Sequence, residues 1–312
     1  MTPRATAGAG EPRVPVRRLV GRRRAALWMF RSLTWFAAAA CVAALGSLAA
    51  ALVQGAAPAL NWITFTTPTV GATGGLANAL VGTLWLQLLT LSAMVPISIG
   101  TATFAVEYAG PRARNAVLLA TDVLAGVPSI VFGYVGYLAF VLAFGWGFSA
   151  LAAALTLTMV VMPYMIRNTA QALQAMPRET REAALALGWT RARVLWHLVW
   201  PAAVPGMATG ALLALSVAMG ETAPLLYTAE WSQLYPSLGL THHSVAYLTY
   251  MVWEYSQQPF PQSVALAYAA GFTLMVLVCA ASILARVRGG TLVRGSANLA
   301  RQTGDASIVD RG

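Results

Sequence analysis

The chain has 312 residues, of which 58% are hydrophobic and 10% charged, and its formal net charge at pH 7 is +10. Soluble domains carry about a quarter charged residues, so this composition excludes an ordinary soluble domain with one buried core. No charged residue occurs between Ser32 and Val106. Because a helix needs about 20 apolar residues to cross a bilayer, this interval is expected to hold two membrane spans joined by a connector.

The arginines divide the chain into cytoplasmic and external parts. All 20 basic residues are arginine, and they gather at 4–31, 112–114, 167–193 and 286–311, with apolar stretches between the groups. Arginine beside a span resists translocation, so each group is expected in the cytoplasm and each arginine-free connector outside. Basic proteins often bind nucleic acid, but this spacing predicts a membrane topology and no nucleic-acid partner.

The first elements in chain order are a tail, a helix and a connector. Residues 1–24 show no apolar period and are predicted to be a disordered basic cytoplasmic tail. The apolar run over 25–54 is longer than the hydrophobic region of a signal peptide, so an uncleaved first transmembrane helix is expected there. Residues 55–74 are rich in turn-forming residues and predict an external connector, with Trp62 at the membrane interface.

Residues 75–285 are expected to form a membrane core that contains spans two to six. The apolar runs place these spans at about 75–106, 115–144, 148–166, 202–226 and 263–285. Residues 286–312 follow as a second cytoplasmic tail. The predicted fold class is therefore an all-α membrane protein with six transmembrane helices and both termini in the cytoplasm.

The loops within this core differ in charge. Residues 167–200 are basic and helical in pattern, which predicts a cytoplasmic loop, whereas residues 227–262 contain no arginine and are expected outside. Pro96 within span two predicts a kink or a break there.

The cytoplasmic loop carries the most specific pattern of the sequence, RETREAALALGWTRARVLWHLVWPAAVPG from Arg178 to Gly206. Glu-Ala-Ala, a glycine and a distal proline in this order resemble the cytoplasmic coupling loop of importer permeases that bind cassette ATPases. The residues that would couple to an ATPase are Arg181, Glu182, Ala183, Ala184, Gly188 and Pro201. Small alanine side chains allow close approach by a partner, and the glycine can take the left-handed conformation that ends a helix.

A second helix, from about Thr190 to Val199, is expected to lead into span five. An alternative interpretation is an amphipathic helix on the membrane surface, with Arg191 and Arg193 at the headgroups and Trp196 at the interface.

Three further segments narrow the resemblance: GGLANAL at 74–80, VPSIVFG at 127–133 and GETAPLL at 220–226. Together they resemble PstA-type permease subunits of phosphate-specific ABC importers. This resemblance implies the type I importer fold, a bacterial inner-membrane location and the import of inorganic phosphate. It also implies a heterodimer with a sister permease, two ATPase subunits that bind ATP and magnesium, and an extracytoplasmic phosphate-binding protein. Phosphonate, sulfate, molybdate and tungstate permeases remain alternatives of similar architecture.

Polar residues expected inside the spans are candidates for the translocation path, because charges in a bilayer are costly. They are Asp122, Arg167, Glu221 and Thr222. Arg167 matches the geometry of an oxyanion, but it could equally reach the headgroups. Asp122 is expected to be a packing residue, and Glu221 either lies near the path or pairs with another helix. Relatives by resemblance carry arginine where this chain has Val217.

Other function classes are disfavoured by what the sequence lacks. Without lysine, the chain has no Walker-type ATP site, so ATP hydrolysis is expected on a separate subunit and no cofactor on this chain. Its three histidines are too dispersed for a metal site. An intramembrane protease would need paired catalytic residues that the predicted spans do not supply, and a passive channel would have no use for a coupling loop.

Overall fold

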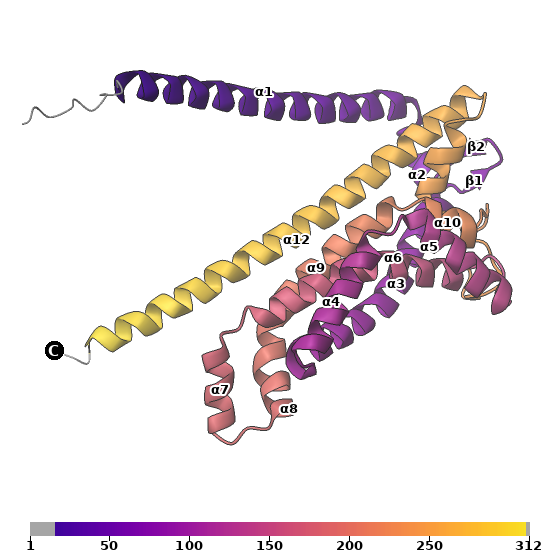
Figure 1. Cartoon of the computed structure of the whole chain (residues 1–312). Coiled ribbons are helices and arrows are strands. Elements are labelled where there is room, and N and C mark those ends of the chain that lie inside the picture. The colour runs from indigo at the N-terminus through magenta and orange to yellow at the C-terminus, as the bar shows by residue number, and fades with distance from the viewer. Residues whose placement is uncertain (1–15, 310–312) are drawn as a thin grey trace, which may run out of the picture. The chain divides into compact units, whose positions relative to one another are not determined.

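The computed structural model describes residues 16–309, and it describes the side chains of residues 27–287. The chain divides into two compact units with the boundary between Ala51 and Leu52. Apart from two short strands, the described residues form helices and their connections (Figure 1).

The first unit consists of most of helix α1 (Val16–Ala56), whose apolar window has no residue buried within the chain. Large side chains such as Trp28, Phe36 and Leu45 are exposed along it, as expected for a helix that faces lipid. The helix begins at Val16, within the segment 1–24 that is predicted to be a disordered tail, and residues 1–15 of that segment lie outside the described residues. Leucine and arginine, which make up most of residues 16–24, have high helix propensity.

The second unit contains the remaining elements. In chain order they are η1 (Ala57–Ala59), α2 (Trp62–Thr66), β1 (Thr69–Val70), β2 (Thr73–Gly74), α3 (Ala77–Thr103), η2 (Phe104–Tyr108), α4 (Pro111–Ala125), α5 (Ser129–Gly136), η3 (Tyr137–Ala143), α6 (Ala150–Gln174), α7 (Arg178–Ala186), α8 (Arg191–Val194), η4 (Leu195–Val199), α9 (Trp200–Gly220), α10 (Ala223–Thr228), α11 (Leu248–Tyr250), η5 (Met251–Tyr255) and α12 (Pro261–Val309). The segment η1 is a 3₁₀ turn, and η2 to η5 are π-helical turns.

The predicted connector contains the only strands among the described residues. Strand β1 pairs antiparallel with β2, and Thr69 lies opposite Gly74. The Asn78 side chain at the start of α3 accepts hydrogen bonds from the backbone nitrogen and the hydroxyl of Thr69, at 3.0 and 2.9 Å. The small hairpin is thereby fixed to the first turn of α3.

Five helices among the described residues are long and apolar enough to cross a membrane, and a sixth span results if α4 and the α5–η3 segment count as one. This pair is bent by 96°, so the continuous span predicted over 115–144 is corrected to two helices. The break falls at Gly126, Val127 and Pro128. Proline has no backbone N–H and disfavours helical geometry in the residue before it, which explains the break.

Helix α6 is the centre of the second unit. It contacts α3, α4, α5, α9 and α10, and two thirds of its apolar window is buried. Figure 1 shows α3, α6 and α9 lying close together. A core of apolar side chains joins these three helices, including Met94 of α3, Met165 of α6 and Met207 of α9.

Glycines bring α9 against α6. A Cβ atom added at Gly206 would lie 2.6 Å from the Cβ of Ala172, and one added at Gly210 would lie 2.6 Å from the Cβ of Asn168. Two small residues four positions apart let helix backbones approach closely, which is a common way to pack helices in membranes.

Replacement of Gly210 by leucine is expected to force α6 and α9 apart, because overfilling a packed contact costs about 1–3 kcal/mol. The midpoint of thermal unfolding of the purified chain in detergent should fall. Gly46→Leu is the matched control, since a Cβ atom there meets nothing within 4 Å. Equal midpoints for the two variants would contradict the close contact.

Candidate functional site

The predicted coupling loop forms a helical hairpin, α7 and α8, at one end of the second unit (Figure 1). Gly188 has a φ of +85°, so it adopts the left-handed conformation that the sequence predicts. The nitrogen of Gly188 donates to the carbonyl of Leu185 at 3.0 Å, and the nitrogen of Trp189 donates to the carbonyl of Ala184 at 3.2 Å. These two bonds define a Schellman motif, which satisfies the last carbonyls of α7.

The second helix of the hairpin begins at a cap. The hydroxyl of Thr190 accepts a hydrogen bond from the backbone nitrogen of Arg193 at 3.3 Å, as expected for an N-cap residue. The guanidinium of Arg193 lies 4.9 Å from the ring centre of Trp189. A cation is attracted to the face of an aromatic ring, so this contact stabilises the turn. Helix α8 continues through η4 into α9, and Pro201 occupies the first turn of α9.

One face of α7 is exposed. Glu182, Ala183 and Gly188 are exposed, and Leu187 at the end of the helix is 81% exposed. Ala184 is partly buried against the core that joins α3, α6 and α9. The exposed face therefore carries the glutamate and one alanine of the pattern, while the second alanine packs inward.

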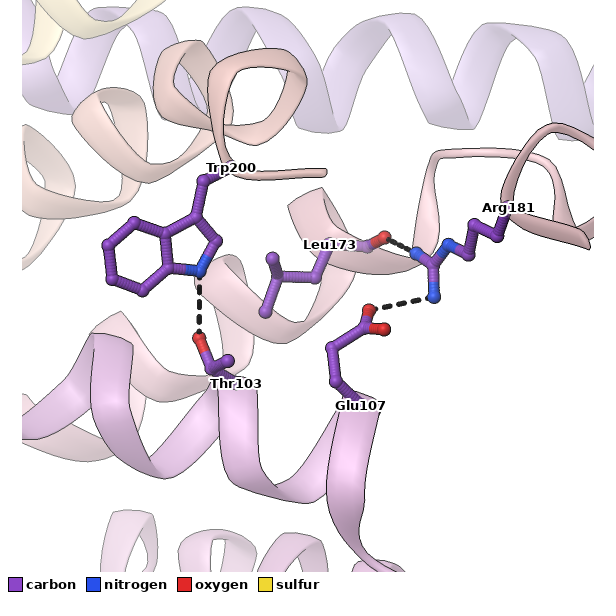
Figure 2. A network of polar contacts seen from close by, with 5 residues as sticks. All are labelled: Thr103, Glu107, Leu173, Arg181 and Trp200. Carbon is purple, nitrogen blue, oxygen red and sulfur yellow. Dashed lines mark hydrogen bonds and ion pairs between the residues drawn. The ribbon is translucent and has the colours of Figure 1, made fainter. Parts of the chain in front are cut away.

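Arg181 points toward the membrane helices (Figure 2). One terminal nitrogen of its guanidinium donates to Glu107 Oε1 at 2.7 Å, and the other donates to the carbonyl oxygen of Leu173. The two charged side chains are only 18% and 17% exposed. The sequence placed Arg181 among the residues that couple to an ATPase, and in the structure its side chain lies off the exposed face of α7 and holds this helix to the ends of α3 and α6.

A second polar contact lies one turn away on the same end of α3. The indole nitrogen of Trp200, at the start of α9, donates to the hydroxyl of Thr103 at 3.3 Å. Sequence reasoning missed both Thr103 and Glu107. The available signal was weak, because Glu107 is simply the first charged residue after the long uncharged interval.

Two of the predicted path residues are brought together. Arg167 of α6 forms an ion pair with Asp122 of α4, and their side chains are 41% and 50% exposed. Arg167 directly follows the predicted span 148–166, and α6 continues for about two further turns beyond it, to Gln174. The pair neutralises two charges that would otherwise be isolated in a membrane helix bundle.

Glu221 and Thr222 lie at a break instead of within span five. Helix α9 ends at Gly220, and Glu221 has extended backbone geometry before α10 begins. Gly220 ends the helix readily, and Pro224 in the first turn of α10 cannot continue it. The hydroxyl of Thr249 donates to the carbonyl oxygen of Glu221 at 3.2 Å. Within the described part of the chain, the Glu221 carboxylate has no ion-pair partner.

No group of three or more His, Cys, Asp or Glu side chains among the described residues could hold a metal ion.

Comparison with known proteins supports a transport role. Residues 94–288 match the model of a family described as "Binding-protein-dependent transport system inner membrane component". The chain is 40% identical to phosphate transport system permease protein PstA 2 of Mycobacterium bovis, over 85% of this chain and 88% of the relative. It is 33% identical to phosphate transport system permease protein PstA of Xylella fastidiosa, over 79% and 88% of the two chains.

Solved structures show the fold. A bacterial alginate ABC transporter, in complex with a periplasmic protein bound to an alginate pentasaccharide, contains a chain with a TM-score of 0.59 at 16% identity. That match covers 86% of this chain and 94% of the other. A chain of the MetNI methionine ABC transporter gives a TM-score of 0.52 at 17% identity, over 68% and 95%. The chain thus has the type I ABC importer permease fold.

Removal of one member of the Asp122–Arg167 pair is expected to leave an uncompensated charge, which at the centre of a membrane helix costs about 2.5–3.5 kcal/mol. Half exposure lowers this cost. Asp122→Asn and Arg167→Gln should each reduce the amount of folded protein in the membrane, and the double variant should recover part of the loss. Quantitative immunoblotting of membrane fractions measures this. A double variant that shows the full sum of both losses would contradict a direct pair.

Proposed function

Since the chain belongs to the family of binding-protein-dependent transport system inner membrane components, we propose that it is a permease subunit of an ABC importer for inorganic phosphate. The observation that carries this proposal is the 40% identity, over 85% of the chain, to a phosphate transport system permease. ATP binding and hydrolysis, with magnesium, take place on a separate ATPase subunit, and this chain binds no cofactor.

The other partners follow from the same reasoning. The chain pairs with a sister permease subunit, two ATPase subunits dock on the cytoplasmic side, and a phosphate-binding protein docks on the external side. Both termini are cytoplasmic, as the distribution of arginine favours. The hairpin formed by α7 and α8 is the ATPase-docking element, because Glu182 and Ala183 of its pattern are exposed and its turn is closed by hydrogen bonds.

The Asp122–Arg167 pair is the best-supported part of a translocation path. A guanidinium matches the oxygens of an oxyanion in a bidentate geometry, and Arg167 is only partly covered by its counter-ion. The partly buried Glu221 carboxylate after the end of α9 pairs with a positive charge of the sister subunit, since this chain has Val217 where relatives carry arginine.

The direct test is reconstitution of the complete complex in liposomes, with the phosphate-binding protein outside. Radiolabelled phosphate should accumulate only with ATP, and phosphate should stimulate ATP turnover more than sulfate, molybdate, tungstate or phosphonate. A complex with an ATPase subunit that cannot hydrolyse ATP is the control. If another of these oxyanions stimulates ATP turnover and no phosphate is taken up, that oxyanion is the substrate instead of phosphate.

The docking role of the hairpin is tested at Gly188. A side chain in the left-handed region costs on the order of 1–2 kcal/mol, which lowers the population of the observed turn about five- to thirtyfold. A Cβ atom at Gly188 meets nothing within 4 Å, so Gly188→Leu should insert into the membrane normally. It should nevertheless lose most ATPase co-purification and phosphate uptake.

The matched control is Gly110→Leu. Gly110 also has open space around it, but its φ of −67° suits any residue. The control should retain ATPase binding. Equal ATPase binding by both leucine variants would show that the Gly188 turn does not carry the docking surface.

A further inference from the structure

The guanidinium of Arg181 is bonded to two different membrane helices at once. It donates to Glu107 in η2, which continues α3, and to the carbonyl of Leu173, in the last turn of α6. These partners are separated from Arg181 by 74 and 8 positions in the sequence. Figure 2 shows one side chain reaching both partners from α7.

The chemistry of arginine explains why this position can serve two partners. The planar guanidinium presents several N–H groups in a fixed fork, so its two terminal nitrogens can hold acceptors on separate elements. A carbonyl in the last turn of an α-helix lacks an intrahelical partner, and a positive charge there also interacts favourably with the helix dipole. Arg181 therefore completes the end of α6 while it neutralises Glu107.

The surroundings make this contact stiff. Both charged side chains are more than four-fifths buried, and the Leu173 side chain is fully buried in the core that joins α3, α6 and α9. Screening by water and salt is weak for such a pair. One turn before Glu107, Thr103 is bonded to Trp200 at the start of α9. The cytoplasmic end of α3 is thus tied to the helices on both sides of the hairpin.

There is also space for movement beside this contact. Glu107 and Arg181 line a pocket of about 230 Å³ together with Leu185 of α7 and Val194 of α8. The hairpin is therefore joined to the end of α3 by a polar link next to a hollow, in addition to the packing of Ala184 against the core. A displacement of α7 would reach α3 through the ion pair as well as through this packing.

We propose that the Arg181–Glu107 pair, with the Leu173 carbonyl, is a latch that transmits movement of the coupling hairpin to α3 and α6. Glu107 and Arg181 are positioning residues and touch neither substrate nor ATP. This inference rests on the proposed function, since it requires α7 to dock on an ATPase. The latch converts docking on the exposed face of α7 into a shift of the two helices that form the centre of the bundle.

The test compares four variants in the reconstituted complex with phosphate-binding protein and inorganic phosphate. Arg181→Met and Glu107→Gln each break the ion pair, and the double variant removes both members. Arg181→Lys keeps the positive charge but lacks the planar guanidinium that reaches both acceptors. Arg112→Met is the matched control, because Arg112 is an exposed arginine nearby on the same side of the chain and has no ion-pair partner among the described residues. Membrane abundance, ATPase co-purification, ATP turnover and phosphate uptake are measured for each.

The latch predicts that the single variants still assemble with the ATPase, but that stimulation of ATP turnover by the loaded binding protein falls about tenfold, within the usual range of coupling between sites. Phosphate transported per ATP should fall in parallel. The double variant should be no worse than either single variant, because both lose the same interaction. Arg181→Lys should retain an intermediate degree of stimulation, and Arg112→Met should resemble the unmodified protein.

Two results would overturn the latch. One is full stimulation and full transport per ATP in Arg181→Met and Glu107→Gln. The other is a loss of abundance and assembly that accounts for the whole decrease in uptake, which would make the pair purely structural. Failure of the proposed function would be visible in the unmodified complex, as absence of phosphate uptake. The latch is tested by comparing ATP stimulation and transport per ATP of the variants with those of the unmodified complex, measured with the oxyanion that stimulates the unmodified complex.

Discussion

A charge inside the membrane region must find its partner within the protein, because hydrocarbon offers neither water nor counter-ions. Asp122 and Arg167 illustrate this constraint, and Glu107 pairs with Arg181 at the end of the bundle, so that each ion pair among the described residues joins different helices. Asp122 and Arg167 fix which sides of α4 and α6 face each other. Glu107 and Arg181 do the same for the end of α3 and the hairpin. The few charges of this chain therefore set the relative rotation of its helices, while the apolar side chains fill the space between them.

Helix α6 shows how this arrangement is completed without a hydrophobic driving force. Lipid tails are as apolar as leucine side chains, so membrane helices associate through close packing and polar contacts. Gly206 and Gly210 of α9 let α6 approach on one side, and the ion pair of Arg167 holds α4 on another. The Leu173 carbonyl at its end receives Arg181. A single central helix thus connects the packed core, a candidate path residue and the hairpin.

Local patterns were enough to predict part of this structure. Apolar runs predicted the membrane spans, and the left-handed Gly188 followed from its place after an alanine-rich helix. The break at Pro128 could not be predicted with the same certainty, since Pro96, Pro163 and Pro205 all lie inside continuous helices. A membrane helix accepts proline when its neighbours satisfy the freed backbone groups, and this depends on tertiary contacts.

The ion pairs are harder to predict from the sequence than the helices are. Arg181 and Glu107 are 74 positions apart, and no periodicity links them. The Glu-Ala-Ala pattern indicates that the neighbouring Arg181 takes part in coupling, but it does not indicate on which side of α7 the side chain lies, because this depends on how the helix is packed. Glu221 was placed inside a span for a similar reason, because hydropathy does not register the end of α9 at Gly220.

The π-helical turns η2 and η4 let the hairpin end of the bundle hold an extra residue without a change in the direction that the flanking helices face. Each residue of an α-helix turns the chain by about 100°, and a π-helical turn accommodates one residue more than an α-helical turn. Deleting a single residue from η4 would let α8 and α9 join as a regular helix, and the hairpin would keep nearly the same rotation around the α9 axis, because the extra residue is held within the π-helical turn. The direction in which the hairpin points is therefore insensitive to a one-residue difference in the length of η4.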